Sequence, residues 1–139
     1  MKRKDNERAM EQARAQLEGI IEMVSAYEEA KNDRDREEAE RRINEDPLEI
    51  SVREPWHAPG EETKPDKYLI LICTGGPAVR ITGDLADFGE PETASIEYQD
   101  WFTQWERLDM TEEEKETVLK YARHFYFGEI GRASCRERV

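Results

Sequence analysis

Outside the last eleven residues, the candidates for ligands of a soft metal ion or for a thiol or imidazole nucleophile are His57, Cys73 and His124. Zinc sites use closely spaced pairs such as C-x-x-C or H-x-x-x-H, and these residues form no such pair. A catalytic Cys–His pair also needs a third group that orients the histidine, and no spacing indicates one. We therefore expect no catalytic residue, no metal and no cofactor, and we expect that the chain is not an enzyme.

The segment Thr74-Gly75-Gly76-Pro77 is a second place where chemistry could reside, as a loop that cradles phosphate. It lacks the Lys-Ser/Thr pair of a P-loop and is followed by a predicted strand, whereas phosphate loops precede a helix. A tight hairpin turn, in which glycine supplies a positive φ, fits the pattern better.

Acidic residues and tryptophans are interspersed between residues 97 and 109, a composition that suits a protein-binding surface. Tryptophan is enriched in binding hot spots, and carboxylates attract a basic partner. A proline-rich loop over residues 54–67 adds a tryptophan and a histidine. The predicted partner-binding residues are Trp56, His57, Glu97, Asp100, Trp101, Trp105 and Glu106. Two alternatives stay open: residues 101–105 close the core, and residues 56–57 form a lid over the sheet.

The charge of the chain narrows the class of partner. Its 139 residues carry a formal net charge of −12. Such a surplus repels nucleic acid and anionic lipid, and a nucleic-acid-binding protein normally has the opposite sign. The longest apolar run, 68–73, is too short to cross a bilayer, and no apolar signal segment follows residues 1–4. We expect a cytoplasmic protein with a basic protein partner and without direct contact to nucleic acid or membrane.

The first 46 residues predict a long, charged helical segment. Apolar residues recur at spacings of three and four over residues 5–30, which is typical of one face of a helix. The centre of this face consists of Leu17, Ile20 and Val24. These side chains either pack on the chain's own sheet or form the seam of a homodimer. The helix continues through residues 31–45 with alternating charges, as a solvated face does.

Residues 47–128 predict an α+β body with four strands. Leu48, Ile50 and Val52 alternate with polar residues, as in a half-buried strand. The apolar run 68–73 is typical of a central strand covered on both faces. Alternating apolar residues predict two further strands, over residues 78–82 and 94–98.

The last element of the body is a helix predicted over residues 111–127. Thr111 and Glu114 have the spacing of a capping box, and apolar residues from 118 to 126 form one stripe. The resulting order is α-β-β-β-β-α. Short connections favour an antiparallel four-stranded meander, with the long N-terminal helix and the C-terminal helix packed on the sheet.

The final residues, 129–139, differ from the rest of the chain. They closely resemble the translation of a short-read sequencing adapter. We expect them to be a non-native tail and exclude them from the reasoning on fold and function. Without them Cys73 is the only cysteine, so no internal disulfide is expected, in agreement with a reducing compartment.

Several segments of the body resemble a known family. They read DPL at 46–48, WHAPG at 56–60, LICTGGPAVRI at 71–81, QDW at 99–101 and YARHFYFG at 121–128. Together they are similar to a family of small uncharacterised proteins carried on proteobacterial plasmids and integrative elements. The resemblance runs from about residue 11 to residue 128. It implies a mobile genetic element as the source and transfers no catalytic residue.

These features suggest three functions. The first is an acidic, non-enzymatic inhibitor of a host defence nuclease (anti-CRISPR type), which would occupy a basic nucleic-acid-binding surface. The second is a regulatory interaction module that dimerises through its N-terminal helix. The third is a small ligand-binding domain or enzyme that uses the loop with Trp56 and His57.

Overall fold

The protein is an α+β structure with one antiparallel sheet and one layer of helices. A computed structural model describes residues 2–74, 77–87, 89–100, 104–125 and 127. Its helices and strands, in chain order, are α1 (Lys2–Glu28), α2 (Asp33–Glu45), β1 (Glu49–Arg53), β2 (Lys67–Cys73), β3 (Ala78–Asp84), β4 (Ser95–Gln99), β5 (Glu106–Arg107) and α3 (Glu112–Ala122). The predicted turn at 74–77 falls partly outside the described residues, and the predicted tail at 129–139 falls wholly outside them.

The sheet has five strands in the order β1-β2-β3-β4-β5, and all neighbouring pairs are antiparallel. The predicted meander is confirmed, but the predicted count of four strands is wrong. The additional strand, β5, has only two residues, Glu106 and Arg107. Both are charged and exposed, so the sequence has no alternation of apolar and polar residues that would predict this strand.

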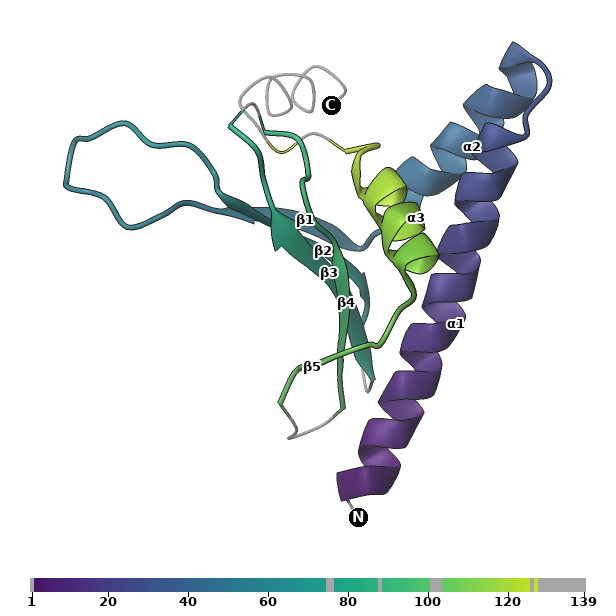
Figure 1. Ribbon diagram of the computed structural model, residues 1–139, viewed down its shortest axis with the longest axis horizontal. Coiled ribbons are helices and arrows are strands. Elements are labelled where there is room, and N and C mark those ends of the chain that lie inside the picture. The colour runs from purple at the N-terminus through teal and green to yellow at the C-terminus, as the bar shows by residue number, and fades with distance from the viewer. Residues whose placement is uncertain (1, 75–76, 88, 101–103, 126, 128–139) are drawn as a thin grey trace.

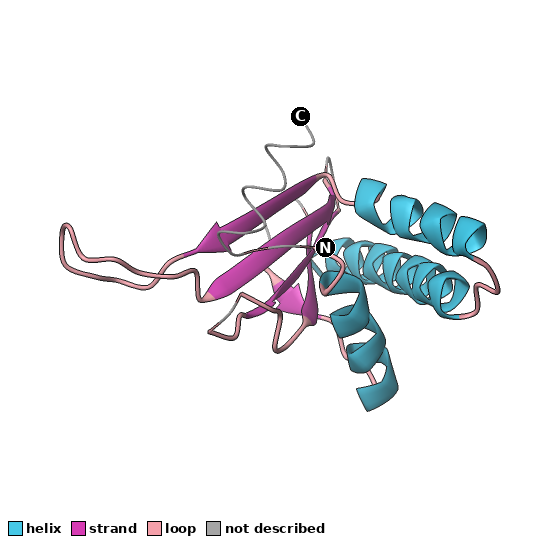
Figure 2. Ribbon diagram, turned by 90° about the horizontal axis from the view of Figure 1, so that it is seen from above, coloured by secondary structure: helices cyan, strands magenta, loops and turns pink. Residues whose placement is uncertain are grey.

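The three helices lie on one side of the sheet (Figures 1 and 2). Along β2, Tyr68, Ile70 and Ile72 are buried, whereas Leu69 and Leu71 between them remain partly exposed. We expected the apolar run 68–73 to be a strand covered on both faces. In the structure the side chains on its second face remain partly exposed. Helices cover one face, and the described residues leave the other face, here called the open face, accessible to solvent.

The predicted continuous helix over residues 5–45 is two helices. The chain reverses after α1, and Asn32 caps α2 by accepting a hydrogen bond from the backbone N–H of Asp35 at 2.8 Å. The reversal lets α2 pack beside α1 (Figure 1) and buries the two apolar side chains of the charged run, Ala39 and Ile43. Those two positions, four residues apart, form the narrow apolar contact of an otherwise solvated helix.

The proposed dimer seam on α1 lies in the core of the chain itself. Leu17, Ile20 and Val24 are at most 3% exposed, because α1 packs on α2, α3, β3 and β4. This is the first of the two arrangements expected from the sequence. A dimer built on the seam would have to remove these side chains from the core.

The C-terminal helix begins as predicted and ends earlier. Thr111 and Glu114 form the capping box: the Thr111 hydroxyl accepts from the Glu114 N–H at 3.2 Å, and the Glu114 carboxylate accepts from the Thr111 N–H at 2.9 Å. The helix stops at Ala122, not at 127. Phe125 and Phe127 are nevertheless buried, in contact with Tyr121 and Tyr68, so apolar side chains continue into a non-helical segment.

The side-chain burial on α1 gives a first prediction. Replacement Leu17→Ala should lower the free energy of unfolding by about 3 kcal/mol, because it removes a buried side chain and leaves a cavity. Met10→Ala, on an exposed part of α1, is the matched control and should change it by less than about 1 kcal/mol. Urea titration followed by circular dichroism measures both. Dissociation of a dimer by Leu17→Ala without loss of monomer stability would contradict this packing.

Candidate functional site

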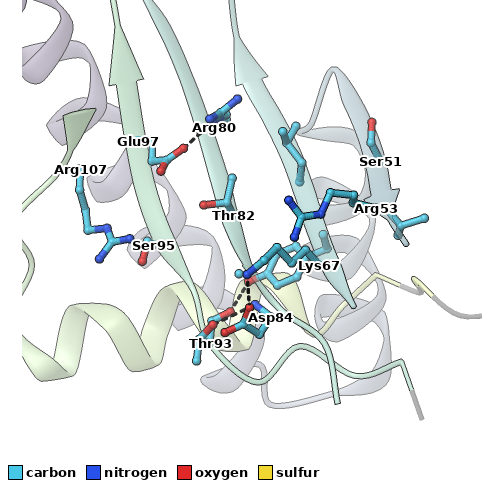
Figure 3. A pocket seen from close by; sticks show the side chains of 14 residues that line it. Ser51, Arg53, Lys67, Arg80, Thr82, Asp84, Thr93, Ser95, Glu97 and Arg107 are labelled. Atoms are coloured by element: carbon cyan, nitrogen blue, oxygen red, sulfur yellow. Dashed lines mark hydrogen bonds and ion pairs between the residues drawn. The ribbon is translucent and has the colours of Figure 1, made fainter. Parts of the chain in front are cut away.

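The open face of the sheet carries a hollow of about 400 Å³ (Figure 3). It is lined from β1, β2, β3, β4 and β5, because every second residue of each strand points to this side. Strand register places these side chains in three rows. The central row contains Ser51, Leu69, Thr82 and Ser95; one outer row contains Arg80, Glu97 and Arg107; the other contains Arg53, Lys67 and Asp84.

The charge of this hollow is opposite in sign to that of the whole chain. Its 14 lining residues include four cations, Arg53, Lys67, Arg80 and Arg107, and two carboxylates, Asp84 and Glu97. The chain as a whole carries −12. The two rows of cations flank a row of hydroxyl groups, which donate and accept hydrogen bonds. Such a set of groups can bind an anion.

Arg80 is the most firmly held cation of the hollow. Its Nε donates a hydrogen bond to Glu97 Oε1 at 2.7 Å, and its guanidinium lies 3.8 Å from the centroid of the Trp105 ring. The ion pair and the cation–π contact together fix the plane of the guanidinium. Its remaining N–H groups are thereby presented in a fixed orientation at one edge of the hollow.

Lys67 and Asp84 close the opposite edge. Lys67 Nζ lies 2.6 Å from Asp84 Oδ1, and the backbone N–H of Asp84 donates to the Thr93 hydroxyl at 2.9 Å. The hydrogen bond from Lys67 lowers the pKa of the Asp84 carboxyl. Gly83 next to this pair is required by space, since a Cβ there would collide with the Thr93 carbonyl and the Tyr68 ring.

The other two cations are less constrained. Arg107 is exposed and forms no ion pair with any residue that the structure describes. Arg53 is also exposed, and its nearest carboxylate oxygen, Asp66 Oδ1, is 3.9 Å away, which is too long for a hydrogen bond. Both guanidinium groups can therefore turn towards a ligand without breaking a strong internal contact.

The structure separates the predicted partner-binding residues into different roles. Glu97 and Trp105 lie beside Arg80, so they belong to the open face. Asp100 is 2% exposed and accepts from Arg8 Nη2 at 3.1 Å, which ties β4 to α1. Glu106 is exposed on β5, and Trp101 lies outside the described residues. The described members of this set therefore do not lie on one surface, since Glu97 and Trp105 share the open face and Asp100 is buried.

Trp56 and His57 are placed elsewhere. They lie in the long β1–β2 connection, which projects from the sheet on the side away from the helices (Figure 1), and the Trp56 side chain is fully exposed. His57 Nδ1 lies 3.0 Å from the carbonyl oxygen of its neighbour Ala58. The loop does not fold back as a lid, so it does not join the site formed by Glu97 and Trp105.

The three residues considered for metal or nucleophilic chemistry serve other contacts. Cys73, at the end of β2, is half-buried, and burial raises the pKa of its thiol. His124 packs edge-on against Tyr27, with ring centroids 4.6 Å apart. In the described part of the chain, no cluster of three or more His, Cys, Asp and Glu side chains could hold a metal ion.

The cations of the hollow were missed from the sequence. A signal was nevertheless present. Once the meander is assumed, the polar positions that alternate with Tyr68, Ile70, Val79, Ile81 and Ile96 must share one face. Pairing the predicted strands would have brought Arg80 next to Glu97. Arg107 could not be found in this way, because β5 was not predicted.

Comparisons with known proteins add no relative. No protein-family model, no curated protein and no solved structure matches the chain. Among the described helices, none is both long and apolar enough to span a membrane.

The contact between His124 and Tyr27 gives a pH-dependent prediction. Burial lowers the pKa of His124 below its usual 6.5, so the unfolded chain takes up this proton first as the pH falls. The associated stability is present above pH 6.5 and is lost as the pH falls through that value towards the folded-state pKa. Urea midpoints measured from pH 7.5 to 5 should therefore decline less in His124→Phe than in the wild type. An equal decline in both proteins would contradict this assignment.

Proposed function

We propose that the protein is a non-enzymatic binding protein whose open face takes up an acidic segment of a partner protein. The single observation that carries this proposal is the gathering of Arg53, Lys67, Arg80 and Arg107 around one hollow of a chain with net charge −12. Eight lysines and arginines lie between residues 47 and 128, and half of them line this hollow. Random placement on an acidic surface does not favour such clustering.

The shape and spacing of the hollow favour an extended segment. The two outer rows are four residues apart along β3, from Arg80 to Asp84, which corresponds to about 13 Å. Carboxylates four residues apart on an extended chain have the same spacing. Partly exposed Leu69 in the central row supplies apolar contact for the intervening side chains. Polynucleotides are less favoured, because the Trp105 ring, on which a base could stack, is already in contact with the Arg80 guanidinium.

Arg107 offers the sharpest test of this site. A fluorescein-labelled peptide of alternating Glu and Ser residues should bind the wild-type protein, and affinity should fall with salt. Arg107→Gln should weaken binding about tenfold, since a charge-assisted hydrogen bond contributes about 1.5 kcal/mol. Arg36→Gln, an exposed arginine on α2, is the matched control and should change nothing.

Fluorescence anisotropy measures these affinities. Inorganic phosphate and a single-stranded oligonucleotide serve as alternative probes in the same assay. Failure of the acidic peptide to bind, or preference for the oligonucleotide, would overturn the proposal.

A second candidate function is an acidic inhibitor that docks on a basic partner, such as the nucleic-acid channel of a defence nuclease. The observation that favours it is a strip of exposed carboxylates around the start of α3. None of the four forms an ion pair with a described residue: Glu106, Asp109, Glu113 and Glu116. Uncompensated charge of this kind accelerates association with a basic surface and is screened by salt.

Neutralisation of this strip separates the second candidate from the first. The variant combines Glu106→Gln, Asp109→Asn, Glu113→Gln and Glu116→Gln; the control combines Asp33→Asn, Glu37→Gln, Glu38→Gln and Glu45→Gln on α2. Both change the net charge equally. In inhibition assays against a panel of CRISPR and restriction nucleases, the strip variant should lose potency about tenfold or more at low salt. Absence of inhibition by the wild type, or equal loss in the control, would contradict this function.

A further inference from the structure

The strand β1 ends the sheet with an edge that the described residues leave unpaired. Its only strand neighbour is β2, in the register Ile50↔Ile70 and Ser51↔Leu69. A free edge offers a row of backbone N–H and C=O groups to another strand. Natural edges are usually protected by proline, by inward-pointing charge or by a bulge. The residues of β1, Glu49–Arg53, contain no proline and pair regularly with β2.

The apolar side chains of this edge are unusually exposed. The sequence predicts a half-buried strand, yet Leu48 is 61% exposed, and Ile50 and Val52 are each 41% exposed. Ile50 and Val52 point to the helix side of the sheet, where their cross-strand partners Ile70 and Tyr68 are buried. Helical cover therefore reaches β2 and stops short of β1. A neighbour that continued the sheet would cover these three side chains.

The sequence of β1 is complementary to itself in antiparallel orientation. If two copies pair about a two-fold axis at Ser51, Glu49 lies opposite Arg53 and Ile50 lies opposite Val52. The first pairing places opposite charges across the strands on one face, and the second places two β-branched apolar residues together on the other. Each such cross-strand pair stabilises an antiparallel sheet, and the two-fold axis makes each pair occur twice.

We propose that β1 is a homodimer interface, at which two copies join their sheets by antiparallel pairing of residues 49–53. The charge complementarity of Glu49 with Arg53 selects a second copy as the occupant of this edge. The dimer joins two five-stranded sheets and places both open faces side by side, with Arg53 of each copy near the joint. Arg53 also lines the hollow of the open face, so the interface and the proposed binding site share this side chain.

Charge exchange between Glu49 and Arg53 tests the pairing. Glu49→Arg alone and Arg53→Glu alone each place like charges opposite one another, and each should weaken the dimer by more than about tenfold. A mixture of the two single variants should form a heterodimer, because opposite charges then face each other again. The double variant, with both substitutions in one chain, should dimerise like the wild type. Glu37→Arg on α2 is the control and should leave the dimer unchanged.

Sedimentation equilibrium at protein concentrations up to about 500 µM provides the readout, since an interface this small supports micromolar to millimolar affinity. The test needs no ligand, so its outcome does not depend on the proposed binding function. Ser51→Cys provides a second measurement: residues that face one another in an antiparallel pair are about 5 Å apart, so mild oxidation should cross-link two copies at this position. Glu62→Cys in the exposed loop should cross-link far less. A wild-type protein that stays monomeric, or single variants that do not recover on mixing, would overturn the proposal.

Discussion

The structure depends on the burial of one stripe of α1 against one face of the sheet. Ala13, Leu17, Ile20 and Val24 are all nearly inaccessible, and they share a single core with Ile70, Ile81, Ile96 and Val118. A chain this rich in charged residues has few apolar side chains. They are enough to form one buried interface, between a helical layer and one face of a sheet. Among the residues that the structure describes, no second layer covers the other face of the sheet, so this open face is accessible to solvent.

The open face of the sheet can be exposed to solvent because it carries polar and charged side chains in place of a second apolar core. Arg80 pairs with Glu97 and stacks with Trp105, while Lys67 pairs with Asp84. These partly exposed pairs contribute little to stability on their own. Their larger effect is to hold cations in a defined position on a chain whose general field is negative. Local and global charge thus have opposite signs, so the positive potential of this face is confined to short range.

Sequence patterns predicted most of the fold, and the errors have physical reasons. The capping box at Thr111 and the alternation in β3 and β4 are local signals, and the structure contains them. The break between α1 and α2 depends on Asn32, whose side chain hydrogen-bonds to the backbone and so competes with continuation of the helix. The residues around Asn32 favour a helix, so propensity alone did not predict the break. The run 68–73 suggested a strand covered on both faces, because leucine is usually buried. The sequence alone does not tell whether another element packs over Leu69 and Leu71.

The candidate site was harder to predict than the fold, because its residues are brought together by the register of the strands and are not adjacent in the sequence. Acidic and aromatic residues adjacent in sequence were grouped together, yet strand pairing sends Glu97 to the open face and Asp100 to a contact with Arg8. The four cations that line the hollow come from four strands, β1, β2, β3 and β5, and are distant from one another in sequence. The pairings Arg80↔Glu97 and Glu97↔Arg107 bring two of them into one row, and the pairing Arg53↔Lys67 brings the other two into a second row.

The contact between Arg8 and Asp100 spans 92 positions of the chain, and it has a consequence for biosynthesis. When α1 leaves the ribosome, the strands and the helix that will cover its apolar side have not yet been made. The nascent helix must remain soluble through this interval, and its many glutamates provide that solubility. Closure of the core is therefore a late event, which waits for β4 and α3 to emerge, whereas the hairpins β1–β2 and β2–β3 can form as soon as each is synthesised.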